Sequence, residues 1–121
     1  MKKRFLLLTA LFGLFIVLSQ AGVYAWGEAA PRRIEVTAKR FTFDPGEITL
    51  KKGQPVVLVL KSADVAHGIR FRELNVDVKV GAHGTAEVLF TPQTTGDFIG
   101  HCSVFCGAGH GSMAIKLHVV D

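Results

Sequence analysis

Short runs in which apolar and polar residues alternate constrain the fold of this chain most strongly. Apolar side chains occupy every second position at Ile34, Val36 and Ala38, and the same pattern recurs further along the chain. Such alternation is typical of β-strands that bury one face. Turn-forming residues interrupt the runs, for example at 44–46 and 81–84. No segment after residue 34 has a convincing helical period, so we predict an all-β domain.

The predicted strands are short and are separated by turns or loops. They lie at 34–43, 48–50, 56–60, 76–80, 86–90, 97–101 and 114–120. The run at 56–60 is continuously apolar, which fits a strand that is buried on both sides. Residues 62–68 are predicted to form a loop. Seven or eight strands in this arrangement indicate a Greek-key β-sandwich.

The N-terminal segment has the layout of a targeting sequence. Basic residues at 2–4 precede an apolar run from Phe5 to Leu18, and small residues follow up to Ala25. This order is typical of a secretory signal peptide that is cleaved after Ala25. A retained membrane anchor is the alternative, because the uncharged stretch from Phe5 to Trp26 is long enough to span a bilayer. Either interpretation places the remaining domain outside the cytoplasm.

The chain is therefore divided into a signal peptide or anchor at 1–25, a linker at 26–33 and a β-domain at 34–121. The net charge of +4 depends on the basic residues near the N-terminus. From Trp26 onward there are 11 Lys and Arg against 10 Asp and Glu. This balance, without a basic stripe among aromatic residues, argues against nucleic-acid binding. No nucleophile–base pair or phosphate loop stands out, so we predict neither catalytic residues nor a small-molecule substrate.

The segment CSVFCGAGHGSM, from Cys102 to Met113, concentrates residues that bind soft metals. It contains both cysteines of the chain and its only methionine besides Met1. Thiolate and thioether sulfur are soft ligands, and imidazole suits copper. The segment lies in the last loop between predicted strands, where neighbouring strands can hold ligands rigidly. The predicted copper ligands in it are Cys102, Cys106, His110 and Met113.

A further nitrogen ligand is expected from elsewhere in the fold. His67 is the best candidate, because the predicted loop after strand 56–60 can return to the same end of a sandwich. Two other interpretations of the cysteines stay open. Cys102 and Cys106 could form a disulfide in an exported domain, although so small a ring would stabilise the fold little. Alternatively, Cys106 alone could serve a single copper.

The ligand spacing resembles that of a known family. The pattern C-x3-C-G-x2-H-x2-M covers Cys102 to Met113, and D-V-x-H covers Asp64 to His67. Together these motifs resemble the CuA domain of cytochrome c oxidase subunit II and nitrous oxide reductase, within the cupredoxin superfamily. The stretch 41–56 is also similar to the first strands of these domains. The resemblance extends over about residues 34–121.

The resemblance implies a binuclear centre in which both cysteine sulfurs bridge two coppers and each copper takes one histidine. It makes Met113 a weak axial ligand of one copper and the backbone carbonyl of Val104 a ligand of the other. The family usually has Glu at position 104, and in the oxidases that side chain reaches a metal site shared with the large subunit. Val104 therefore argues against an ordinary oxidase subunit. The resemblance would also imply two membrane spans and a tryptophan-rich stretch, whereas we expect at most one span here and the only tryptophan, Trp26, lies outside the domain.

The function implied is that of an extracytoplasmic electron carrier with His110 as its electron port. A c-type cytochrome or a terminal oxidase or reductase would be its redox partner, and the chain would have no catalytic activity of its own. Three alternatives stay open. They are a single-copper cupredoxin that uses His67, Cys106, His110 and Met113, a copper-delivery protein, and an accessory subunit II-like component of a terminal oxidase.

Overall fold

A computed structural model describes residues 30–121 of the chain. The expected signal peptide or anchor at 1–25 and the first half of the expected linker, residues 26–29, lie outside the described residues. Within the described range, no helix has the length and apolar character needed to cross a membrane.

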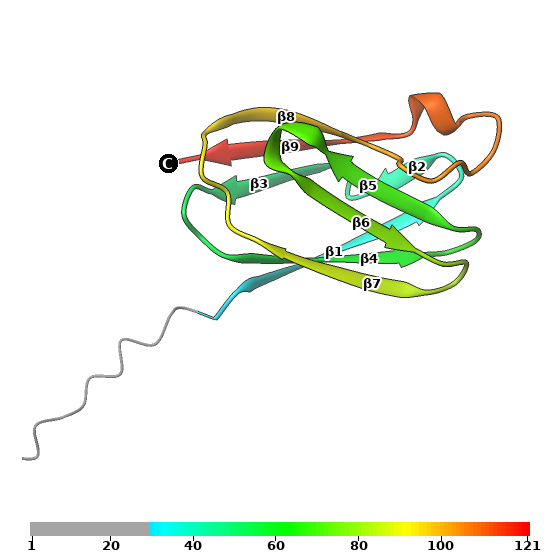
Figure 1. Ribbon diagram of the computed structural model, residues 1–121, viewed down its shortest axis with the longest axis horizontal. Coiled ribbons are helices and arrows are strands. Elements are labelled where there is room, and N and C mark those ends of the chain that lie inside the picture. Colours follow the sequence, from blue (N-terminus) through cyan, green and yellow to red (C-terminus); the bar gives the residue numbers. More distant parts are fainter. Residues whose placement is uncertain (1–29) are drawn as a thin grey trace, which may run out of the picture.

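The described residues form two β-sheets that pack face to face (Figure 1). The strand order is β2-β1-β4-β7 in the four-stranded sheet and β3-β9-β8-β5-β6 in the five-stranded sheet. The strands are β1 (Arg32–Lys39), β2 (Thr42–Asp44), β3 (Glu47–Lys51), β4 (Val56–Ser62), β5 (His67–Phe71), β6 (Val76–Val80), β7 (Thr85–Phe90), β8 (Gly96–His101) and β9 (Ala114–Val120). Two single-turn 3-10 helices, η1 (Arg72–Leu74) and η2 (His110–Ser112), complete the described part of the chain. The prediction of an all-β sandwich is confirmed.

The core lies between the two sheets and is built by the alternation that the sequence displays. In β1, Val36 and Ala38 are buried while their neighbours are more exposed. In β9, Ile115, Leu117 and Val119 share the buried face. Removing these apolar side chains from water provides the main drive for packing the two sheets together.

A strand that was not predicted from the sequence begins inside a predicted loop. Residues 62–68 were expected to form a loop with His67 inside it, but His67 is the first residue of β5. This strand pairs antiparallel with β6 from His67 to Phe71, and it meets β8 where Arg70 lies opposite His101. Because Gly68 has no side chain, residues 67–71 do not show an alternation of apolar and polar side chains in the sequence. The strand is nevertheless largely buried, between β6 and β8. His67 is therefore held by a sheet.

The prediction of a single first strand at 34–43 is wrong in two respects. The chain reverses at Arg40 and Phe41, so that β2 pairs antiparallel with β1. The alternation continues through this turn, and a period of two cannot reveal the reversal. The strand β1 also begins at Arg32, because Arg32 and Arg33 extend its parallel pairing with β4. In Figure 1 the β1–β2 turn lies at the same end of the sandwich as the β4–β5 connection and the loop before β9.

Candidate metal centre

The loop between β8 and β9 is closed at its base by the backbone. The amide of Cys102 donates a hydrogen bond to the carbonyl of Met113, with 3.0 Å between nitrogen and oxygen. Within the loop, His110 starts η2, and its amide bonds to the carbonyl of Gly107 at 3.1 Å. The two ends of the predicted metal-binding segment are therefore fixed to the same sheet.

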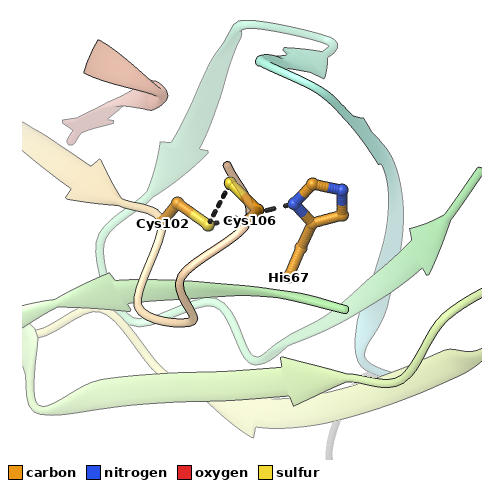
Figure 2. A group of neighbouring side chains, drawn as sticks. All are labelled: His67, Cys102 and Cys106. Carbon is orange, nitrogen blue, oxygen red and sulfur yellow. Dashed lines mark hydrogen bonds between the residues drawn. The ribbon is translucent and has the colours of Figure 1, made fainter. Parts of the chain in front are cut away.

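Two thiols and an imidazole form the centre of the candidate site. The sulfur atoms of Cys102 and Cys106 lie 3.7 Å apart, and both cysteines are free and buried. The Nδ1 atom of His67, which is 0% exposed, lies 3.9 Å from the sulfur of Cys102. Figure 2 shows the three side chains turned toward one another. Their ligand atoms all lie within 4.8 Å of one another, so this group can hold a metal ion.

The other predicted ligands lie against the same two sulfurs. The Nδ1 atom of His110 and the Sδ atom of Met113 each lie 3.7 Å from the sulfur of Cys106. The carbonyl oxygen of Val104 lies 3.2 Å from the sulfur of Cys102. The fold thus brings all six sequence-predicted residues together, and their role as copper ligands stays a prediction.

Asp64 orients the buried histidine. One carboxylate oxygen of Asp64 lies 2.6 Å from Nε2 of His67 and accepts the backbone N–H of Val65, also at 2.6 Å. The other oxygen accepts the backbone N–H of Arg40 at 2.8 Å. The hydrogen bond from Arg40, with those from His67 and Val65, lowers the pKa of Asp64 to about 2. Because an ionised carboxylate only accepts hydrogen bonds, neutral His67 carries its proton on Nε2 and keeps a lone pair on Nδ1 for a metal.

The buried Cys106 thiol is protonated at neutral pH when no metal is bound. Burial, together with the neighbouring Cys102 thiol, raises the pKa of the Cys106 thiol to about 11. A cation that binds Cys106 as thiolate must therefore displace a proton at neutral pH.

Two residues that sequence reasoning assigned no role at the site support the loop from the β1–β2 turn. The side-chain Nε of Arg40 donates to the carbonyl of Cys106 at 3.0 Å. The ring of Phe41 packs so closely on the loop that a Cβ added at Gly109 would lie 2.5 Å from it. Gly107, with φ of +135°, would meet the same ring at 3.0 Å. No sequence signal connects a turn near residue 40 with a loop near residue 107.

An open groove of about 680 Å³ runs along the outer side of β5 and β8 and reaches Cys102. Its lining includes Arg70 and Arg72 but also Glu73 and Asp97. Because both signs of charge are present, the groove does not select a partner by net charge.

The comparison with protein families identifies the fold that carries this site. Residues 7–115 match the family model described as a cupredoxin-like domain. The chain belongs to the cupredoxin-like family. This membership confirms the predicted relation to the cupredoxin superfamily.

Among curated proteins, the chain is 32% identical over 104 residues to nitrous-oxide reductase of Cupriavidus necator. That match covers 83% of this chain and 16% of the reductase. The chain is also 30% identical over 80 residues to cytochrome c oxidase subunit 2 of Thermus thermophilus, which covers 66% of this chain and 59% of the relative. The chain thus spans less than two thirds of these relatives' length. They belong to the two protein classes that its motifs resemble.

Among solved structures, the periplasmic domain of subunit II of cytochrome oxidase (CoxB) of Bradyrhizobium japonicum has the same fold. Its TM-score is 0.69 at 23% identity, and the match covers 77% of this chain and 86% of that chain. The "blue" copper protein auracyanin A of Chloroflexus aurantiacus also shares the fold, with a TM-score of 0.61 at 21% identity over 75% of this chain and 100% of that chain.

The residues at the site fit copper. The donor set consists of two buried thiols, two imidazole nitrogens, a thioether and a carbonyl, and soft donors of this kind select copper over hard cations. Family membership, the relatives and the donor chemistry together support a copper-binding domain related to the CuA domains of cytochrome c oxidase subunit 2 and nitrous-oxide reductase.

Proposed function

We propose that the domain is an electron carrier with a binuclear copper centre of the CuA type. One observation carries the proposal: the two sulfurs lie 3.7 Å apart and each has its own imidazole. The Nδ1 atom of His67 lies 3.9 Å from Cys102, and that of His110 lies 3.7 Å from Cys106. A single copper would need only one of the thiols, whereas a shared pair of thiolates would use both.

The two weaker donors are also divided between the two sulfurs. Met113 lies on the side of Cys106, and the carbonyl of Val104 lies on the side of Cys102. Each half of the centre therefore has a sulfur, an imidazole and one weaker donor. Two coppers, one in each half, would use the whole set, which supports the binuclear assignment of His67, Cys102, Val104, Cys106, His110 and Met113.

When bound, copper would supply a redox couple that gains and loses a single electron. The contribution of the protein is to keep its donors still during that change. His67 is fully buried and fixed by Asp64, and the loop is tied to Arg40 and closed at its base. Ligands held by packing and by outer hydrogen bonds rearrange little, and little rearrangement favours fast electron transfer.

We assign the electron port to His110. Its ring centroid lies 5.6 Å from that of Phe105, a side chain that is 78% exposed. An exposed aromatic beside a half-buried ligand offers a partner protein an apolar contact close to the metal. Partners of the proposed carrier are a c-type cytochrome or a terminal oxidase or reductase. Its relation to a periplasmic domain of an oxidase subunit, together with the N-terminal targeting pattern, supports a location outside the cytoplasm.

A single-copper site is the second candidate, because the sulfur of Cys106 contacts both His110 and Met113 at 3.7 Å. In that site Cys102 would be dispensable. The two candidates therefore differ in what Cys102 does.

The test is a copper titration of the reduced, metal-free full chain and of its Cys102→Ser variant. We expect two coppers per wild-type chain and a clear loss of copper, with an altered visible spectrum, in Cys102→Ser. The control is His101→Ala, which changes an exposed neighbour of Cys102 and should keep wild-type stoichiometry. One copper per chain and an unaltered spectrum in Cys102→Ser would overturn the binuclear proposal in favour of the single-copper site.

A further inference from the structure

Arg40 lies in the β1–β2 turn and is linked to both halves of the candidate centre, to Cys106 directly and to His67 through Asp64. Its backbone N–H donates to Asp64, whose other oxygen holds Nε2 of His67. Its side-chain Nε donates to the carbonyl of Cys106, 66 residues away in the sequence. One residue thus joins the segment that orients the first histidine to the loop that carries the second cysteine.

Arg40 also brings charge to a loop that has none of its own. The segment from Cys102 to Met113 contains no Asp, Glu, Lys or Arg. Across residues 30–121, Arg40 is the one charged side chain that forms a hydrogen bond with the backbone of this segment. A guanidinium stays protonated at any pH the protein would meet. The loop therefore has a fixed positive charge at the peptide group of a proposed ligand.

We propose that Arg40 is a positioning residue of the copper centre, which fixes the Cys106 carbonyl and raises the reduction potential through its charge. The proposal rests on the copper-binding function argued above. An oxidised centre carries more positive charge than a reduced one, so a nearby cation destabilises the oxidised form. Hydrogen bonds and charge around thiolate ligands are among the main determinants of copper potentials.

The geometry allows the two contacts of Arg40 to be separated by mutation. The bond to Asp64 uses the backbone N–H, so it survives any change of side chain except proline. Arg40→Gln removes the charge, and Arg40→Lys keeps the charge but loses the planar donor group. Arg32→Gln is the matched control. Arg32 lies at the opposite end of β1, and its Nη1 donates to the carbonyl of Thr49 at 3.0 Å, so the control removes an equal charge and a similar contact.

The first arm of the test needs no copper. Amide hydrogen exchange is measured on reduced, metal-free full chain, and we expect faster exchange at residues 106–110 in Arg40→Gln than in wild type or Arg32→Gln. Because this arm is independent of the metal, a chain that binds no copper would refute the proposed function without affecting this result. Equal exchange in Arg40→Gln and Arg32→Gln would overturn the positioning role.

The second arm is protein-film voltammetry of the copper-loaded variants. We expect a lower reduction potential in Arg40→Gln than in wild type and Arg32→Gln, with a partial return toward wild type in Arg40→Lys. A potential in Arg40→Gln equal to that of Arg32→Gln would overturn the electrostatic role. A potential in Arg40→Lys as low as in Arg40→Gln would also overturn it, because the charge is then present without effect.

Discussion

The Nε2 atom of His67 lies 2.6 Å from Oδ1 of Asp64, and this contact turns the Nδ1 atom of the ring toward Cys102. The carboxylate is itself held by the backbone N–H groups of Arg40 and Val65. A fully buried imidazole therefore has one nitrogen committed to the protein and the other available to a metal. Outer contacts of this kind keep a ligand ready to bind before the metal arrives.

Replacement of Asp64 with Asn should weaken copper binding. The variant loses the ionised acceptor that holds His67, and loss of such partners typically lowers metal affinity about 10–100-fold. Affinity is measured by competition with a copper chelator of known strength. Asp44→Asn, at an exposed strand end, is the control and should bind as wild type does. Equal affinities for wild type and Asp64→Asn would contradict this role.

Asp64 should also make stability depend on acid pH. Its folded-state pKa of about 2 lies below the ordinary value of 3.8, so its stabilising effect is complete above pH 3.8 and is lost as pH falls through about 2. Urea unfolding of metal-free protein should show wild type more stable than Asp64→Asn by about 1–3 kcal/mol at pH 6. The difference should shrink toward zero near pH 2. A difference in the free energy of unfolding that stays constant from pH 6 to pH 2 would contradict this role of Asp64.

Gly109→Ala should destabilise the loop, because the new Cβ would lie 2.5 Å from the ring of Phe41. Overpacking of this kind typically costs about 1–3 kcal/mol. Thermal unfolding measures the loss, and Gly111→Ala is the control because no atom lies within 4 Å of its added Cβ. In a Phe41→Ala background the cost of Gly109→Ala should largely disappear. A cost that persists there would show that the ring is not its cause.

His118 should titrate above its ordinary pKa of 6.5. A hydrogen bond to Asp97, with 2.6 Å between Nδ1 and Oδ1, raises the pKa of His118, and Glu47 raises it further. The contact therefore adds stability below pH 6.5, and this stability is lost as pH rises through the folded-state pKa. NMR titration of the imidazole protons measures the pKa, and Asp97→Asn should lower it. If His118 titrated at or below 6.5 in wild type, the ion pair would have no effect in solution.

The local sequence predicted most of the fold, because strands such as β4, β6 and β9 carry their own alternating or continuous apolar patterns. The alternation pattern failed to predict the structure where pairing with neighbouring strands determines it. The strand β5 contains Gly68 and owes its form to pairing with β6 and β8. The turn at Arg40 and Phe41 preserves the alternation while reversing the chain.

In the candidate site, too, the sequence predicted some residues and missed others. Cys102, Val104, Cys106, His110 and Met113 lie in one loop, so their spacing could be recognised directly. The contacts that Arg40 and Phe41 make with this loop join segments more than 60 residues apart, and no short-range pattern encodes them. A single sequence therefore indicates the donors better than it indicates the residues that hold them.

Electron paramagnetic resonance of the copper-loaded, oxidised protein tests the central claim most directly. If Cys102 and Cys106 bridge two coppers, one unpaired electron is shared between two equivalent nuclei. The account predicts a seven-line hyperfine pattern together with two coppers per chain. A four-line pattern with one copper per chain would contradict it.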